Sequence, residues 1–298
     1  MAVDILVTGA TGKLGKLVVP RLLEAGKTVR VLTRRPQEAV GLWGDKVEVA
    51  QGDFADPETV RKAARGAQKL FLLSPISEAL ITHQNAAIDA AKAAGVVRIV
   101  KISGSDWTLR NADRSISGAA RAAVEEHLTA SSIAHAILRP NAWMQVSFAP
   151  VIAAAIKGED LPSRYGNAPV SYIDAQDIAD VAVRALLDHS ISSDPLVLTG
   201  AEALTSLEVA RIAARILQRP IGISDASSAA LPSHLDAFER RAIDGFVDLI
   251  GAGLAAPVTQ TVSRITGRQP RAVEEFLRSH LRPAQTQTHG PKGEKTWH

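Results

Sequence analysis

The chain has 298 residues, 46% of them hydrophobic, which is enough for one large domain or for a main domain with a smaller lobe. It contains no cysteine, and this excludes disulfides, thiolate metal sites and a cysteine nucleophile. The net charge of +3 is spread along the chain without a basic stripe, so no nucleic-acid partner is expected.

The sequence carries no signal for a membrane, for secretion or for a metal. No apolar run reaches the roughly 18 residues that a membrane span needs, and the start "MAVDILV" lacks the features of a signal peptide. The eight histidines are scattered, without the spacing of a zinc-binding helix. We therefore predict a cytoplasmic protein with no membrane contact and no metal site.

Short β-branched segments alternate with longer amphipathic segments over the first two thirds of the chain. This alternation is typical of βα units and predicts an α/β fold, a Rossmann-type doubly wound parallel sheet. The expected strands are residues 4–8, 28–33, 47–51, 69–73, 98–103, 135–138 and 196–199.

Capping residues support these boundaries. Asp56 followed by Pro57 has the pattern of a helix N-cap with proline in the first turn. Thr205 and Glu208 have the spacing of a capping box, and the helix that they begin should end before Arg219.

The pattern becomes less regular beyond residue 140, where Pro, Gly and Ser loops separate the helices. We expect the Rossmann domain to cover residues 1–140, with later strands returning from about 165–200. A smaller mixed lobe, which would contribute to substrate binding, is expected over 141–284. The polar, aperiodic residues 285–298 are expected to form a disordered tail.

The segment "TGATGKLG" stands between the first expected strand and the first expected helix. A glycine-rich turn in that position directs backbone N–H groups and the positive end of the helix dipole at one point, which favours an anion. Gly9 permits a tight turn, Gly12 leaves room for a diphosphate, and Gly15 allows close packing of helix on strand. The residues expected to bind the cofactor here are Gly9, Thr11, Gly12, Lys13, Leu14 and Gly15.

The same segment also resembles the phosphate-binding loop of nucleotide triphosphatases. That alternative fits poorly, because Ala10 stands where its first glycine should be. Leu17 occupies the position whose hydroxyl would bind magnesium.

The end of the second strand favours NADP(H) over NAD(H). An acidic residue there would bind the ribose hydroxyls of NAD, but the sequence reads "VRVLTRRP". Arg34 and Arg35 would place two guanidinium groups at the 2′-phosphate, although arginines also occur in solvated loops. Further on, Asp53 is expected to bind the adenine amino group and Phe54 to cover the ring. The middle of the cofactor is expected to lie along Leu73, Ser74 and Pro75.

Several segments together resemble the NmrA-like family, an atypical branch of the short-chain dehydrogenase/reductase superfamily. They are "TGATGKLG", "LTRRP", "GDFADPETV", "AAIDAAKAAGVVRIVKIS", "AILRPNAWM" and "SYIDAQDIADVAVRAL". The resemblance implies a Rossmann fold and NADP(H). It also implies one of two roles: an NADPH-dependent reductase of quinones, azo dyes or triphenylmethane dyes, or a dinucleotide-binding redox sensor.

The Tyr-x-x-x-Lys pair of typical short-chain dehydrogenases is missing. Aligning the segment on Glu125 places Ser117 at the tyrosine and Arg121 at the lysine. Reduction of a simple ketone needs a proton donor of that kind, so alcohol dehydrogenase chemistry is not expected. A quinone, azo bond or cationic dye accepts hydride into a stabilised product, and the protein then needs only to align donor and acceptor.

The nicotinamide end of the site is expected after the fifth and sixth strands. Ser103 is the single candidate catalytic residue, and a strand-ending hydroxyl that caps a loop is its alternative interpretation. Relatives place an asparagine where Val146 stands, so the substrate contacts are not simply carried over. Residues expected at the cofactor are Ser103, Pro140 and Asn141, and those expected to line the substrate are Ser105, Trp143, Met144 and Tyr165.

Two functions follow as hypotheses. The first is an NADPH-dependent reductase of an electrophilic small molecule that works without a Tyr/Lys pair. The second is a non-catalytic NADP(H)-binding redox sensor of the NmrA type, which would require a protein partner. A homodimer is compatible with either function.

Overall fold

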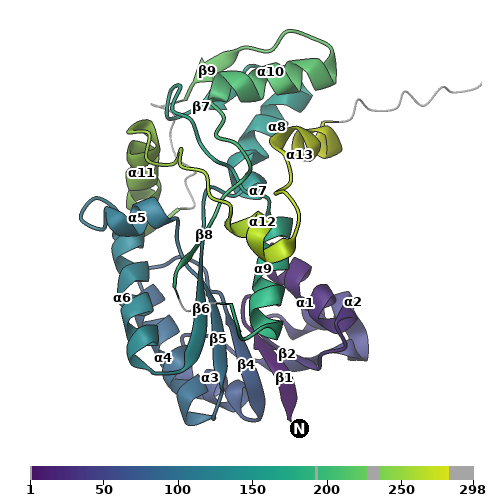
Figure 1. Cartoon of the computed structure of the whole chain (residues 1–298), viewed down its shortest axis with the longest axis vertical. Helices are drawn as coiled ribbons and strands as arrows, with labels where there is room; N and C mark the ends of the chain where they lie inside the picture. The colour runs from purple at the N-terminus through teal and green to yellow at the C-terminus, as the bar shows by residue number, and fades with distance from the viewer. Residues whose placement is uncertain (1, 192–193, 227–234, 282–298) are drawn as a thin grey trace, which may run out of the picture.

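Seven strands of the computed structural model, which describes residues 2–191, 194–226 and 235–281, pair into one parallel sheet. The strands are β1 (Val3–Val7), β2 (Val29–Thr33), β3 (Glu48–Gln51), β4 (Ala67–Leu72), β5 (Arg98–Ile102), β6 (Ala134–Pro140) and β8 (Leu196–Leu198). Their order is β3-β2-β1-β4-β5-β6-β8 (Figure 1). The expected tail at 285–298 lies outside the described residues.

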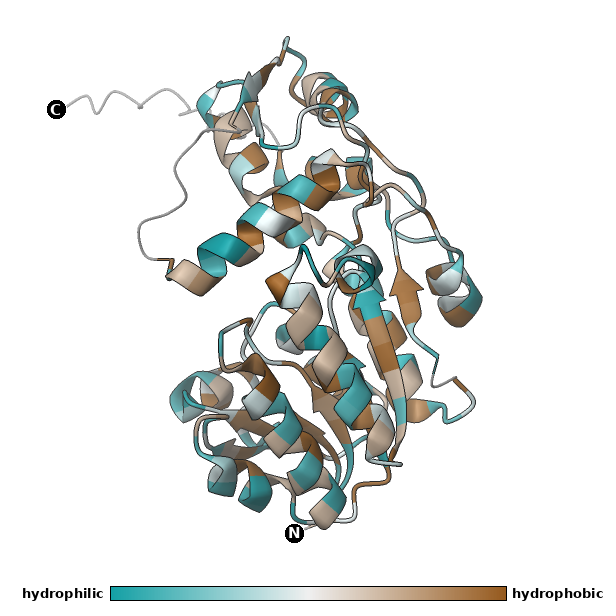
Figure 2. Ribbon diagram, turned by 90° about the vertical axis from the view of Figure 1, so that its left-hand side faces the viewer, coloured by the Kyte–Doolittle hydropathy of each residue, from teal (hydrophilic) through white to brown (hydrophobic). Residues whose placement is uncertain are grey.

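The central strands are apolar because helices cover the sheet on both faces. Every residue of β2 and of β5 is buried, as expected of a parallel sheet between two helical layers. In Figure 2 the visible strands are mostly in the hydrophobic colour, whereas the surrounding helices alternate between hydrophobic and hydrophilic segments. The doubly wound fold predicted from the sequence is thereby confirmed.

The two helical layers bury separate hydrophobic clusters. One face is covered by α1 (Gly15–Glu24), α2 (Pro36–Trp43), α9 (Ala175–Leu187) and α12 (Thr261–Thr266). The other face is covered by α3 (Pro57–Ala64), α4 (Leu80–Ala93) and α6 (Ile116–Ala130). A 3-10 turn (Gly44–Lys46) precedes β3, and the short α5 (Asp106–Arg110) follows β5.

A smaller lobe stands over the carboxyl end of the sheet and has its own core (Figure 1). It contains α7 (Met144–Ser147), α8 (Ala149–Lys157), α10 (Ser206–Leu217), α11 (Ala237–Gly251), α13 (Val273–His280) and a two-stranded sheet of β7 (Leu161–Ser163) and β9 (Ile223–Asp225). The sequence did not predict β7 and β9. Each has three residues that include proline or polar residues, whereas the equally short β8 is wholly apolar.

Predicted helix ends are confirmed. The Asp56 side chain accepts a hydrogen bond from the backbone N–H of Glu58 and caps α3, with Pro57 in its first turn. Thr205 and Glu208 form the capping box of α10. Gln218 then ends that helix in the left-handed conformation.

An ion-pair network joins the lobe to the sheet domain. Asp177 on α9 is fully buried, and its carboxylate accepts hydrogen bonds from the guanidinium groups of Arg268 and Arg271. Asp180, one turn later, pairs with the same two arginines and with Arg21 of α1. This network therefore positions the segment that leads into α13.

Candidate functional site

The glycine turn has the geometry that a diphosphate requires. Gly9 has a positive φ of 62°, a conformation that favours glycine. A Cβ atom on Gly15 would lie 2.2 Å from the carbonyl oxygen of Ala10 and 2.4 Å from that of Gly9. Only glycine at position 15 lets the first turn of α1 pack this closely on the loop, which leaves the helix N-terminus open to an anion.

The adenosine end of the site is formed by the carboxyl ends of β2 and β3. Arg34 is 71% exposed, and its Nη1 lies 3.7 Å from Oδ2 of Asp53. Arg35 pairs with Glu38 at 2.9 Å and donates to the Thr11 hydroxyl at 3.3 Å, which connects this end to the glycine turn. Arg35 is therefore placed beside the glycine turn, and Arg34 lies beside Asp53 just after β3.

The segment after β4 lies against the glycine turn. The Thr8 hydroxyl donates to the carbonyl of Leu73 at 2.9 Å, and the backbone N–H of Leu73 donates back to the same hydroxyl. Ser74 is buried and accepts a hydrogen bond of 2.8 Å from Nε2 of Gln84 on α4. The sequence analysis did not predict a role for Gln84. Its complete burial within α4 and its bond to Ser74 identify it as a residue that positions Ser74.

Phe54, expected to cover the adenine, lies near the first turns of α4. Its ring is stacked against His83 with 6.2 Å between centroids. This aromatic pair provides a flat surface at the adenosine end.

At the carboxyl ends of β5 and β6, hydroxyls and charges are bonded to one another. Ser103 donates to the carboxylate of Glu125, a buried residue of α6. Arg139 binds the same carboxylate and also donates to Asp106 at 2.6 Å. Ser105 donates to the carbonyl of Pro140 at 3.0 Å. The hydroxyl of Ser103 therefore faces the helix layer, and its catalytic role stays a prediction.

Asn141, expected at the cofactor, has its side chain engaged elsewhere. Its amide donates to the Ser171 hydroxyl at 2.6 Å and to the Ala255 carbonyl at 2.8 Å, and its oxygen accepts from Trp107 Nε1. These bonds join β6 to the lobe. The backbone N–H of Asn141 also donates to the carbonyl of Leu198 at 2.8 Å, so its expected contact with a cofactor stays a prediction.

Three of the residues expected to line the substrate pack in or against the hydrophobic cores. Met144 is 1% exposed and packs within the core of the lobe, which corrects its assignment as a lining residue. Trp143 is partly exposed and packs on the core beneath the sheet. Tyr165 is also partly exposed, and its hydroxyl lies 3.0 Å from that of Tyr172. Burial raises the pKa of both phenols, so neither becomes a better proton donor.

Two further cations lie below the β5 loop: Arg121, which the sequence placed at the lysine of the missing Tyr/Lys pair, and Lys101, which the sequence analysis did not single out. Lys101 is 0% exposed, and its Nζ has no hydrogen-bond partner among the described residues. Burial, together with the nearby charges of Arg121 and Arg139, lowers the pKa of Lys101 to about 7. Burial also lowers the pKa of Arg121 to about 10. The position of a lysine between hydrophobic residues in "RIVKIS" is the sequence signal that could have identified Lys101.

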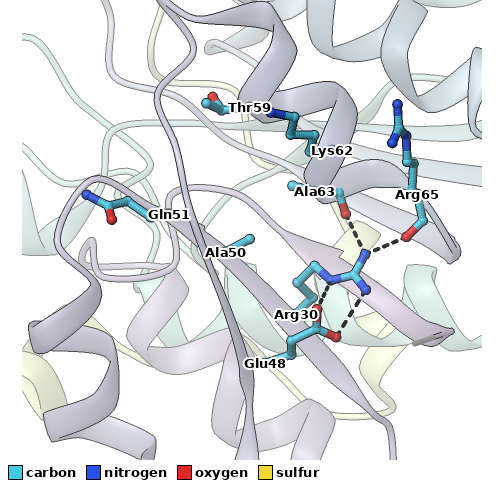
Figure 3. Close-up of a pocket in the computed structure, with 8 residues that line it drawn as sticks. All are labelled: Arg30, Glu48, Ala50, Gln51, Thr59, Lys62, Ala63 and Arg65. Carbon is cyan, nitrogen blue, oxygen red and sulfur yellow. Dashed lines mark hydrogen bonds and ion pairs between the residues drawn. The ribbon is translucent and has the colours of Figure 1, made fainter.

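Two hollows in the described part of the chain are candidates for a ligand site. Figure 3 shows the smaller one, of about 410 Å³, along β3 and α3. Its Arg30 binds Glu48 and the backbone carbonyls of Ala63 and Arg65, so this arginine closes the end of α3 and stabilises the edge of the sheet. The hollow has no glycine turn, and we assign it no ligand.

The larger hollow, of about 650 Å³, lies between the start of α1 and the lobe. Lys13 and Leu17 border it on the sheet side, and Ile152 of α8 and Phe276 of α13 border it on the lobe side. It is therefore shared by both parts of the chain and adjoins the glycine turn.

A strand, glycine turn and helix at the switch point of a doubly wound sheet define a dinucleotide-binding protein of the Rossmann type. The model of the NmrA-like family matches residues 1–277, and the chain belongs to this family. It is 33% identical to (4-alkanoyl-5-oxo-2,5-dihydrofuran-3-yl)methyl phosphate reductase of Streptomyces griseus, over 93% of this chain and 97% of that protein. It is 31% identical to the NAD(P)H azoreductase of Xenophilus azovorans, over the same shares of the two chains.

A solved structure shares the fold. The NADPH complex of an NADPH-dependent quinone oxidoreductase from Escherichia coli superposes with a TM-score of 0.82 at 23% identity. The match covers 93% of this chain and 99% of that one. Among the described residues, no helix has both the length and the apolar character that crossing a bilayer requires.

Proposed function

We propose that this protein is an NADPH-dependent reductase that transfers hydride to an electrophilic small molecule. The observation that carries the proposal is the glycine turn, with Arg35 after β2 bonded to Thr11 of the turn and Arg34 beside Asp53. Relatives named as reductases at 31–33% identity over nearly the whole chain support the same reaction class.

The chain's own residues would contribute binding and alignment. The backbone of the glycine turn would hold the diphosphate, and Arg34 with Arg35 would hold the 2′-phosphate. When bound, NADPH supplies the hydride. Ser117 and Arg121 stand where a Tyr/Lys pair would be needed for ketone reduction, so the proposed acceptor is one whose reduced form is already stabilised, such as a quinone, an azo compound or a related dye.

Mixing the purified chain with NADPH and a panel of quinones and azo dyes tests this proposal. We expect oxidation of NADPH, followed at the nicotinamide absorbance, with at least one acceptor class. Measurable NADPH binding with no turnover across the panel would contradict the reductase and favour the alternative sensor. The cytoplasmic location, a homodimer and any protein partner remain predictions.

Arg34→Ala is expected to lower the affinity for NADPH about tenfold, because a charge-assisted hydrogen bond contributes on the order of 1.5–3 kcal/mol. NADH lacks the 2′-phosphate, and its affinity should change less than about twofold. Calorimetric titration of both coenzymes measures the ratio. Arg61→Ala, at an exposed arginine of α3, is the matched control. An unchanged ratio in Arg34→Ala would show that this arginine does not select the coenzyme.

Gly15→Ala is expected to weaken NADPH binding at least tenfold. The added Cβ would meet backbone oxygens at 2.2 and 2.4 Å, and the turn must open to relieve the contact. Gly41→Ala is a suitable control, because position 41 also lies in a helix and its Cβ would have no neighbour within 4 Å. Equal coenzyme affinities in the two variants would show that the turn does not bind the diphosphate.

A further inference from the structure

Two cations remain without a bonded carboxylate below the loop that follows β5. The carboxylates of this region belong to Glu125 and Asp106, and both are bonded to Arg139. Glu125 also accepts from Ser103, and Asp106 also pairs with the exposed Arg110. Within the described part of the chain, Lys101 and Arg121 therefore form no ion pair and no side-chain hydrogen bond.

Arg121 lies directly against this loop. A Cβ on Gly104, the first loop residue to follow Ser103, would come within 2.6 Å of Arg121 Cδ and 3.2 Å of its Nε. The absence of a side chain at position 104 is thus what allows the arginine to reach the carboxyl end of β5. Protein atoms surround most of the Arg121 side chain, but the residue is partly exposed, so part of it remains accessible to solvent.

This position belongs to the nicotinamide half of the site. A dinucleotide bound at the switch point between β1 and β4 would have its adenosine end toward β2 and β3, where Arg34 and Asp53 lie. The other half then lies over β4, β5 and β6, where Arg121 and Gly104 meet.

We propose that Arg121 binds the oxygen atom of the acceptor that becomes negatively charged during reduction, and that the acceptor is therefore a conjugated carbonyl compound such as a quinone. This inference rests on the proposed reductase function and names its substrate class. The supporting feature is a partly exposed guanidinium that forms no ion pair among the described residues and lies against Gly104 at the carboxyl end of β5.

The chemistry balances with the groups named. Hydride from the bound coenzyme forms a new C–H bond on the acceptor, and a C=C or C=O π pair moves onto oxygen. The guanidinium holds that oxyanion by charge-assisted hydrogen bonds, and a proton from water then completes the reduction. A cationic triphenylmethane dye becomes neutral on accepting hydride, so Arg121 would repel the substrate and gain nothing from the product.

Calorimetry with a product mimic tests the oxyanion site without turnover. The probes are 4-nitrophenolate, an aromatic oxyanion, and 4-nitroaniline, a neutral compound of similar shape, each titrated into the free chain and into the chain with NADP⁺. We expect the wild type to prefer the phenolate at least tenfold. Arg121→Met should remove that preference, and Arg121→Lys, which keeps the charge but not the planar fork, should retain part of it. Arg114→Met changes an exposed arginine just before α6 and should leave the preference intact.

Kinetics with two acceptors then tests the substrate class. Arg121→Met should lower kcat/KM for a neutral quinone at least tenfold and leave kcat/KM for a cationic dye unchanged or raised. A wild type without phenolate preference, or a preference that survives in Arg121→Met, would overturn the assignment of Arg121. A wild type that oxidises no NADPH with any acceptor would instead contradict the proposed reductase, while the titrations would still decide whether Arg121 binds an oxyanion. Thermal unfolding of each variant shows whether it is folded.

Discussion

Lys101→Met is expected to increase the free energy of unfolding by about 3–5 kcal/mol at mildly acidic pH. The wild-type ammonium is fully buried and has no hydrogen-bond partner among the described residues, so its charge is costly in the folded chain. Methionine has a similar length and flexibility and no polar atom, and it should fill the same volume between β5 and α6.

The effect should depend on pH in a defined direction. The pKa of Lys101 is lowered from 10.5 to about 7 by burial and by the neighbouring Arg121 and Arg139, while Glu125 acts in the opposite direction. His135 of the adjacent strand β6 lies on the same face of the sheet as Lys101. Between pH 7 and 10.5 the unfolded chain binds the proton and the folded chain does not, so the wild type gains stability as the pH rises. Below pH 7 both states are protonated and the full cost is present.

Urea unfolding of wild type and variant across this pH range measures the difference. The advantage of Lys101→Met should be largest at acidic pH and should approach zero as the pH nears 10.5, the ordinary value for lysine. The same substitution at the exposed Lys92 of α4 controls for general effects of removing a charge. A difference that does not change with pH, or a less stable variant, would show that the ammonium is paired or hydrated.

The sheet could be predicted from the sequence because its strands are short segments with aliphatic residues between longer amphipathic segments, even where a strand carries charges, as β5 does. All seven expected strands are present, and the two that were missed have three residues each. The glycine turn was also predictable, since its function depends on local spacing. The bonding of single polar groups was not predictable in the same way. Ser103 binds Glu125 across 22 positions, and the amide of Asn141 reaches Ala255 across 114.

These pairings depend on how the lobe and α6 fold back on the sheet, which no periodicity encodes. The same limitation explains Met144. An apolar residue after a strand end is compatible with a core or with a cleft, and only the packing of the lobe places it in the core. Lys101 is the converse case, because the strand was predicted correctly and the charge buried within it was overlooked.

Glu125→Gln is the second large effect, and we expect a loss of about 3–5 kcal/mol in unfolding free energy, as for the removal of one partner of a buried ion pair. The carboxylate is 6% exposed and bonds both Arg139 and Ser103. Without this carboxylate, Arg139 would keep Asp106 as its partner, while Lys101 and Arg121 would lose the negative charge nearest to them. Glu126→Gln, at the exposed neighbour on α6, should change stability by less than about 0.5 kcal/mol and serves as the control.

The double variant shows whether the buried charges act as one cluster. Glu125 raises the pKa of Lys101, so its removal should lower that pKa further, and the loss in Glu125→Gln should be larger at acidic pH, where the ammonium remains charged. Adding Lys101→Met removes the cation whose charge Glu125 stabilises in the wild type. The loss caused by Glu125→Gln should therefore be smaller in the Lys101→Met background, by roughly 0.5–3 kcal/mol, in a double-mutant cycle. Strictly additive effects would mean that Lys101 and Glu125 do not interact.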